Sequence, residues 1–147
     1  MKTLPSSVLF ACSQNSVRSP MAEALAKRLY GHSVYLDSVG VRADEVDSFA
    51  AAVLDEIGID VHRHHAKTFD DVDPSSFDLI VTLSPEAHHK ALELTRTIAA
   101  DVEYWPTPDP TAIEGTREQR LSAYREVRDQ LTERIKNRFG WHAGGNE

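Results

Sequence analysis

The only cysteine of this chain, Cys12, lies six residues before Arg18, and the two enclose the stretch Ser-Gln-Asn-Ser-Val. A cysteine thiolate is a good nucleophile, and an arginine guanidinium binds phosphate-like anions through two parallel hydrogen bonds. Held around the same anion, the pair would suit attack by sulfur on a bound phosphorus atom. The spacing alone is a weak signal, because a buried cysteine and an unrelated surface arginine give it about once in thirteen chances. The flanking residues therefore decide between the two interpretations.

These flanking residues predict a strand before Cys12 and a helix after Arg18. Residues 7–11 form an apolar run typical of a buried parallel strand. Ser19 is a favourable N-cap, and Pro20 suits the first helical position, where an N–H would have no partner. The helix that follows presents one apolar face, formed by Ala22, Leu25, Ala26 and Leu29.

A short loop between a strand and a helix can turn its backbone N–H groups inward and form a nest for an anion. The positive end of the helix dipole faces the same nest and favours negative charge there. Asn15 within the loop tolerates left-handed backbone, which suits a tight curve. We therefore expect a phosphate-binding loop that also stabilises a thiolate, built from Ser13, Gln14, Asn15, Ser16, Val17, Arg18 and Ser19.

The rest of the chain predicts alternating strands and helices. Further strands are expected at residues 33–39, 78–83 and 101–105, the first and last of them as outer strands. A short helix should follow Ser84-Pro85, and a longer final helix should begin with a Thr116–Gln119 capping box. One further helix is expected to present the apolar stripe Ala50, Val53, Leu54 and Ile57 and to end at Gly58. The apolar stripe of the final helix consists of Leu121, Tyr124, Val127, Leu131 and Ile135.

This alternation, with right-handed crossovers, predicts an α/β fold of three layers. The expected sheet has four parallel strands in the order 2-1-3-4, with helices on both faces. Ligands of such sheets bind beyond the carboxyl ends of the strands, where Cys12 lies.

A carboxylic acid is needed if the leaving group is an alkoxide or phenoxide, because that oxygen must be protonated as it departs. Asp109 follows the last predicted strand and therefore belongs to the same edge of the sheet as Cys12. An Asp-Pro pair is also common turn chemistry, and on their own Asp109 and Pro110 favour that plainer interpretation.

The stretch VLFACSQNSVRSPMAEA, residues 8–24, resembles the signature of the low-molecular-weight protein tyrosine phosphatase family, which includes related arsenate reductases. The resemblance continues through LDSVGV, LDEIGIDVHRHHAKTF, FDLIVTLS and WPTPDP, and so covers nearly the whole chain. It implies a flavodoxin-like fold and a cysteinyl-phosphate intermediate, with Cys12, Arg18 and Asp109 as catalytic residues. It also implies that Asn15 braces the loop and that Ser19 donates a hydrogen bond to the thiolate.

Some features are closer to the arsenate reductase side of this family. Thr111 and Ala112 stand where eukaryotic-type phosphatases carry tyrosines, and the segment after the second strand lacks an aromatic residue. We favour hydrolysis of phosphomonoesters of the phosphotyrosine type and keep arsenate reduction as the alternative. A non-catalytic phosphate-binding module is a third possibility, disfavoured because binding alone needs neither the thiol of Cys12 nor the acid of Asp109.

The cysteine count bears on the alternative. Thioredoxin-coupled reductases of the family resolve their cysteine–arsenate adduct with two further cysteines, and this chain has none. Arsenate reduction would therefore need an external thiol or a glutaredoxin-like partner. Val17 stands where many family phosphatases carry a second loop cysteine, so oxidised Cys12 would also depend on an outside thiol.

Composition sets the remaining expectations. The 147 residues suit a single domain, with a flexible tail at about residues 140–147. A net charge of −7 argues against nucleic acid and anionic membrane partners, and no apolar stretch is long enough to span a membrane. One cysteine and no signal-peptide pattern favour a cytoplasmic protein.

Neither a metal nor a cofactor is expected. The histidines at positions 62, 64, 65, 88 and 89 are interpreted as solvated loop residues, because no second cluster at ligand spacing accompanies them. Lys67 is either a source of positive potential near the loop or a surface lysine, and Trp105 should pack at the end of the last strand. The expected ligands are a phosphorylated protein or small phosphomonoester, and the oxyanions phosphate, sulfate and arsenate.

Overall fold

The computed structural model describes residues 4–140 and contains one parallel sheet in the order β2-β1-β3-β4. Its strands are β1 (Ser7–Cys12), β2 (Tyr35–Gly40), β3 (Leu79–Thr82) and β4 (Asp101–Tyr104). β1 pairs with both β2 and β3, while β2 and β4 form the two edges. The predicted order and the two predicted outer strands are confirmed. The predicted flexible tail lies, apart from residue 140, outside the described residues.

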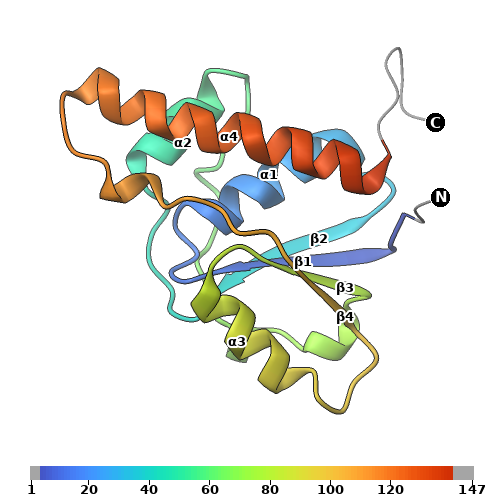
Figure 1. The fold of residues 1–147 in the computed structure, drawn as a ribbon. Helices are drawn as coiled ribbons and strands as arrows, with labels where there is room; N and C mark the ends of the chain where they lie inside the picture. Colours follow the sequence, from blue (N-terminus) through green and yellow to red (C-terminus); the bar gives the residue numbers. More distant parts are fainter. Residues whose placement is uncertain (1–3, 141–147) are drawn as a thin grey trace.

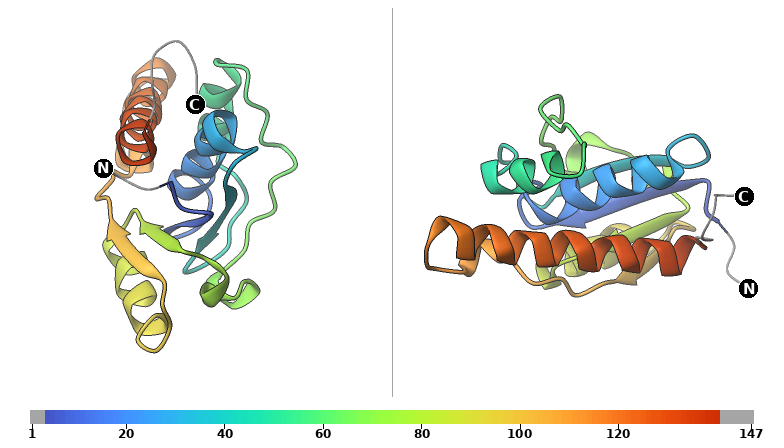
Figure 2. Two further views of the ribbon diagram at one scale, coloured as in Figure 1. Left: turned by 90° about the vertical axis from the view of Figure 1, so that its right-hand side faces the viewer. Right: turned by 90° about the horizontal axis from the view of Figure 1, so that it is seen from above.

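Helices cover both faces of this sheet. On one face lie α1 (Arg18–Tyr30), α2 (Ser48–Asp55) and α4 (Arg117–Phe139), and on the other lies α3 (Pro85–Leu94) (Figure 1). The end-on view of Figure 2 shows the resulting three layers, with α4 packed beside α1 and α2. The predicted flavodoxin-like α/β sandwich is confirmed. Within residues 4–140, no helix has the length and apolarity needed to cross a membrane.

Alternation of side chains along β1 decides where the thiol points. Val8 and Phe10 pack into the core beneath α1 and α4, whereas Leu9 and Ala11 pack into the core beneath α3. Cys12 continues the first set, so its side chain is directed toward α1 and is 2% exposed. Trp105 also joins this core, with its ring edge-on to Phe10 at 6.1 Å between centroids, as predicted.

The final helix follows its sequence pattern closely. Thr116 and Gln119 form the predicted capping box, and the predicted apolar stripe is buried. The second predicted helix differs: α2 ends at Asp55, before the predicted stop, and Ile57 is 37% exposed. A turn carries the chain onward there, and Gly58 adopts a positive φ of 82°, which glycine tolerates without strain.

Candidate active site

The loop between β1 and α1 is held from outside by the segment that follows β2. Four backbone N–H groups of that segment donate to loop carbonyls at 2.8–3.1 Å: Val41 to Cys12, Arg42 to Ser13, Asp44 to Gln14 and Asp47 to Ser16. In a trans peptide the N–H points opposite to the C=O. With these carbonyls turned outward, the loop amides that follow them face the interior, as an anion nest requires.

Gly40, the last residue of β2, permits this close docking. A Cβ atom at this position would lie 2.3 Å from the Arg42 carbonyl oxygen and 2.6 Å from the Asn15 backbone nitrogen. Both atoms belong to the backbone, so neither can move aside without displacing the loop.

Asn15 ties the loop to three other parts of the fold. Its backbone has a positive φ of 53°, and its side chain is fully buried. Its Nδ2 group donates to Ser19 Oγ at 2.9 Å and to Ser38 Oγ at 3.0 Å. Its Oδ1 atom accepts from the Lys67 backbone N–H at 3.0 Å and lies 3.0 Å from His64 Nε2. The amide thus connects the loop to α1, to β2 and to the segment after α2.

Ser19 does not cap α1, and the N-cap prediction is wrong. The helix begins at Arg18, and Val17 occupies the cap position without a side-chain hydrogen bond. The Ser19 hydroxyl instead lies 2.9 Å from Cys12 Sγ and donates to the Val39 carbonyl at 3.1 Å. These tertiary partners outweigh the local capping preference of serine. Because no side chain caps the helix, its first N–H groups remain available to an anion.

A cavity of about 230 Å³ opens above the thiol. It is lined by Cys12, Ser13, Gln14, Ser16, Val17, Arg18, Arg42, Asp109 and Thr111. The structure thus brings Cys12, Arg18 and Asp109 to one cavity. Asn15 and Ser19, which the sequence assigns to the phosphate-binding set, are not among the lining residues, and their side chains make the hydrogen bonds behind the loop.

Arg18 and Asp109 are each held by hydrogen bonds, the first to a distant segment of the chain and the second within its own turn. The Arg18 Nη1 group donates to the Thr107 carbonyl at 3.1 Å. Asp109 caps a short 3₁₀ helix (Pro110–Ala112), with its Oδ1 accepting from the Thr111 backbone N–H at 3.0 Å and hydroxyl at 2.7 Å. Within residues 4–140 its Oδ2 atom has no hydrogen bond. The Asp-Pro pair therefore forms a turn and also brings a carboxylate oxygen to the cavity.

His64 is a site residue that sequence reasoning missed, and the prediction that it is a solvated loop histidine is wrong. Its side chain is 9% exposed, with Nδ1 3.7 Å from Glu23 Oε1 and Nε2 directed at Asn15. Burial lowers the pKa of His64, and the negative charge of Glu23 opposes that shift. Glu23 is itself buried, accepting from the Ser38 hydroxyl at 2.5 Å and pairing with Lys27. The sequence carried no signal for this, because 49 residues separate His64 from Asn15.

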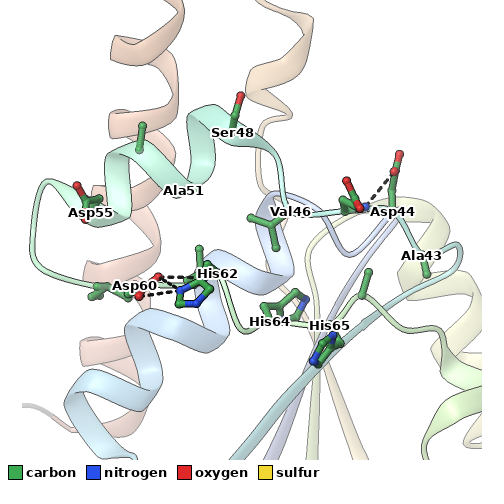
Figure 3. Close-up of a pocket in the computed structure, with 15 residues that line it drawn as sticks. Ala43, Asp44, Val46, Ser48, Ala51, Asp55, Asp60, His62, His64 and His65 are labelled. Atoms are coloured by element: carbon green, nitrogen blue, oxygen red, sulfur yellow. Dashed lines mark hydrogen bonds and ion pairs between the residues drawn. The ribbon is translucent and has the colours of Figure 1, made fainter.

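The neighbouring histidines differ from His64. Figure 3 shows His62 turned toward Asp60, whose two carboxylate oxygens lie 2.9 Å from its Nδ1. His65 is exposed, and all three histidines line a second cavity of about 970 Å³ between α2 and residues 59–66. On the other face of the sheet, His88 stacks on Tyr104. Among residues 4–140, no group of three histidine, cysteine or carboxylate side chains is placed to hold a metal.

Lys67 contributes to the site through its backbone. Its ammonium group pairs with Asp37 at 2.7 Å, and its side chain is not among those that line the 230 Å³ cavity. Its N–H, as described above, donates to Asn15. The positive potential at the cavity therefore comes from the two lining arginines and the loop amides.

Known proteins are similar to this chain in sequence and in fold. The profile of the family described as low molecular weight phosphotyrosine protein phosphatase matches residues 7–140. An arsenate reductase of Bacillus licheniformis is 34% identical over 132 residues, covering 88% of this chain and 91% of the relative. A glutaredoxin arsenate reductase of Synechocystis is 30% identical over 131 residues, covering 88% and 93%. The crystal structure of the tyrosine phosphatase amsI of Erwinia amylovora superposes with a TM-score of 0.76 at 20% identity, covering 92% of this chain and 91% of that chain. This chain therefore belongs to the low molecular weight phosphotyrosine protein phosphatase family.

Proposed function

We propose that the chain hydrolyses phosphomonoesters of the phosphotyrosine type, on a protein or a small molecule, through a phosphocysteine intermediate. The observation that carries the proposal is that Asp109, from the segment after β4, lines the same cavity as Cys12 and Arg18 at the two ends of the β1–α1 loop. A nucleophile, an anion-binding cation and a proton donor are the groups that phosphoryl transfer to sulfur requires.

In the first step, Arg18 and the inward loop amides bind the phosphoryl oxygens. The Cys12 thiolate attacks phosphorus, the S–P bond forms and the bond from phosphorus to the leaving oxygen breaks. Asp109, in its acid form, gives its proton to that oxygen, so the leaving group departs as a neutral alcohol or phenol.

In the second step, water attacks the phosphocysteine. The Asp109 carboxylate takes a proton from the water, the S–P bond breaks, and inorganic phosphate leaves. The sulfur departs as a thiolate, which the Ser19 hydroxyl at 2.9 Å can stabilise by hydrogen bonding. No second thiol is needed, which suits a chain with one cysteine.

Arsenate reduction is the second candidate. It is favoured by the curated relatives, which are named arsenate reductases, and by the absence of an aromatic side chain among the residues lining the cavity. With one cysteine, the two electrons that reduce arsenate would come from Cys12 and an external thiol. The two sulfurs would become joined in a mixed disulfide as arsenite is released. A further thiol or a glutaredoxin-like protein would then restore Cys12.

The decisive comparison measures phosphate release from an aryl phosphate alongside arsenite formation from arsenate with glutathione and glutaredoxin. We expect phosphate release that is lost in Cys12→Ser, and no arsenite. Arsenite formation without phosphatase turnover would establish the second candidate. Binding of phosphate with neither activity would instead indicate a binding module. Arg96→Gln, an exposed change outside the cavity, serves as the control variant and should behave as the native chain does.

A further inference from the structure

Arg42 is a second guanidinium at the cavity, and the reaction proposed above does not use it. It lines the cavity together with Cys12 and Arg18. Its position is fixed from the backbone, because its N–H donates to the Ser13 carbonyl at 2.8 Å. The Arg42 backbone therefore belongs to the segment that holds the loop.

A carboxylate outside the cavity orients this guanidinium. Its Nη1 and Nη2 groups donate to the two oxygens of Glu86, in the first turn of α3, at 2.7 and 2.9 Å. Of this ion pair, Arg42 lines the cavity and Glu86 does not, so an anion in the cavity would meet the positively charged member. The hydrogen bonds to Glu86 raise the pKa of Arg42, and those from Arg42 lower the pKa of Glu86. Both groups are therefore charged at neutral pH.

Glu86 does not use up the binding capacity of Arg42. A guanidinium has five N–H donors, and this pair occupies two of them. The Arg42 and Glu86 side chains are 55% and 45% exposed, and an ion pair this open is weak because water and salt screen its charges. An anion entering the cavity can therefore bind the remaining donors or compete with Glu86.

We propose that Arg42 determines specificity by binding an acidic group, a carboxylate or a second phosphate, on the leaving-group side of the substrate. The inference rests on the proposed function for its orientation: Cys12 and Arg18 take the reacting phosphoryl group, which leaves Arg42 for the remainder of the molecule. A wall without aromatic residues offers a flat leaving group little stacking, whereas a second cation offers an acidic one a direct partner.

Two non-hydrolysable ligands, one with and one without an acidic group, measure how much that group adds to binding. 4-Carboxybenzylphosphonate and 4-carbamoylbenzylphosphonate have nearly the same shape, and they differ by one negative charge. By calorimetry, we expect the native chain to bind the carboxylate about fivefold more tightly than the amide. Arg42→Gln should remove this preference, and Glu86→Gln should increase it by removing the competing carboxylate. Arg96→Gln, which makes the same change in net charge, should keep it.

The following results would overturn the inference. Equal affinity of the native chain for both ligands would do so, as would a preference that survives in Arg42→Gln. An equal weakening of both ligands in Arg42→Gln, with the preference retained, would show that Arg42 stacks on the ring instead of binding the acid. Failure of the native chain to bind either phosphonate would contradict the inference and the anion cavity together.

Hydrolysis of the two corresponding aryl phosphates, measured in parallel, separates this inference from the proposed function. If neither is hydrolysed while the binding preference depends on Arg42, the phosphatase assignment fails and the specificity role stands. If both are hydrolysed in a Cys12-dependent reaction without a preference, the phosphatase assignment stands and the role of Arg42 fails.

Discussion

The Ser19 hydroxyl lies 2.9 Å from Cys12 Sγ and 3.1 Å from the Val39 carbonyl oxygen, and its single proton can serve only one of them at a time. While Cys12 is a thiol, its S–H can donate to Ser19 and the hydroxyl can donate to Val39. Once the sulfur is ionised, the hydroxyl can turn its proton toward the thiolate. The same serine thus fits both protonation states of Cys12.

Removal of this hydroxyl should make Cys12 less reactive. In Ser19→Ala we expect the rate of Cys12 alkylation by iodoacetamide at pH 7 to fall about 3–10-fold, because the thiolate loses one hydrogen bond. Ser13→Ala is the matched control, since the Ser13 hydroxyl donates to Ser84 Oγ at 3.1 Å and not to sulfur. Equal alkylation rates in the native chain and Ser19→Ala would show that the contact does not stabilise the thiolate.

Gly40→Ala should disrupt the loop without touching any catalytic side chain. The added Cβ meets backbone atoms of Arg42 and Asn15, so we expect a loss of about 1–3 kcal/mol in the free energy of unfolding, together with weaker phosphate binding. Urea denaturation and calorimetric titration with phosphate measure the two effects.

Gly140→Ala separates crowding from backbone strain. Gly140 has a positive φ of 83°, and a Cβ there would meet nothing within 4 Å. The Gly140→Ala variant should lose about 1 kcal/mol in the free energy of unfolding and keep the phosphate affinity of the native chain. If Gly40→Ala instead bound phosphate as tightly as the native chain, the segment after β2 would not be needed to shape the phosphate-binding loop.

The stability of the fold should fall as the solution becomes acidic, partly because of His64. Burial lowers its pKa in the folded state, so in the window below the unfolded value of 6.5 the unfolded chain binds more protons. The contribution of His64 to the free energy of unfolding is therefore complete above pH 6.5, and it is lost as the pH falls toward the pKa of His64 in the folded state. The charged groups around it are Glu23 and Asp37, which oppose the shift, and Lys67 and Lys27, which support it.

His64→Gln tests this dependence. We expect urea denaturation between pH 7.5 and 5 (a range set by the histidine pKa of about 6.5) to show a smaller acid-induced loss than in the native chain. His62→Gln is the control, because His62 is exposed and paired with Asp60. A native pH profile in His64→Gln would indicate that other groups cause the loss.

Asp109→Asn should lower turnover by about 10²–10⁴. The decrease should be larger for phenyl phosphate than for p-nitrophenyl phosphate, because a poor leaving group depends more on protonation. The amide can still accept a hydrogen bond from the Thr111 N–H, so the turn should persist. Steady-state kinetics with both substrates measure the effect, and an equal decrease in kcat/KM, which reports the first step, would remove Asp109 from the role of general acid.

The sheet was predictable from the sequence because its signals are local. Apolar runs mark β1 and β3, and the strand order follows from the handedness of the crossovers. Cys12 and Arg18 lie at the two ends of one loop, so their placement could also be inferred. Asp109 was singled out only through the family resemblance, because an Asp-Pro pair after a strand is equally typical of a turn. The prediction for Ser19 was wrong because capping preference is local, while its actual partners, Cys12 and Val39, are tertiary.

Other parts of the site depend on contacts between distant segments. Gly40 and Arg42 matter because the segment after β2 docks on the loop, 25 or more residues away in the chain. His64 lies beside two histidines that share its residue type but differ in environment, and only the fold distinguishes them. Periodicity and capping patterns contain no information about such docking.

The central claim is that Cys12 carries the phosphoryl group during turnover. Asp109→Asn, mixed with p-nitrophenyl phosphate and quenched in acid, tests it directly, because a good leaving group permits the first step while loss of the base slows the second. Mass spectrometry should find the peptide containing Cys12 heavier by one phosphoryl group, and no such adduct in Cys12→Ser. Turnover that persists in Cys12→Ser, or p-nitrophenol release by Asp109→Asn without a phosphorylated Cys12 peptide, would contradict the account.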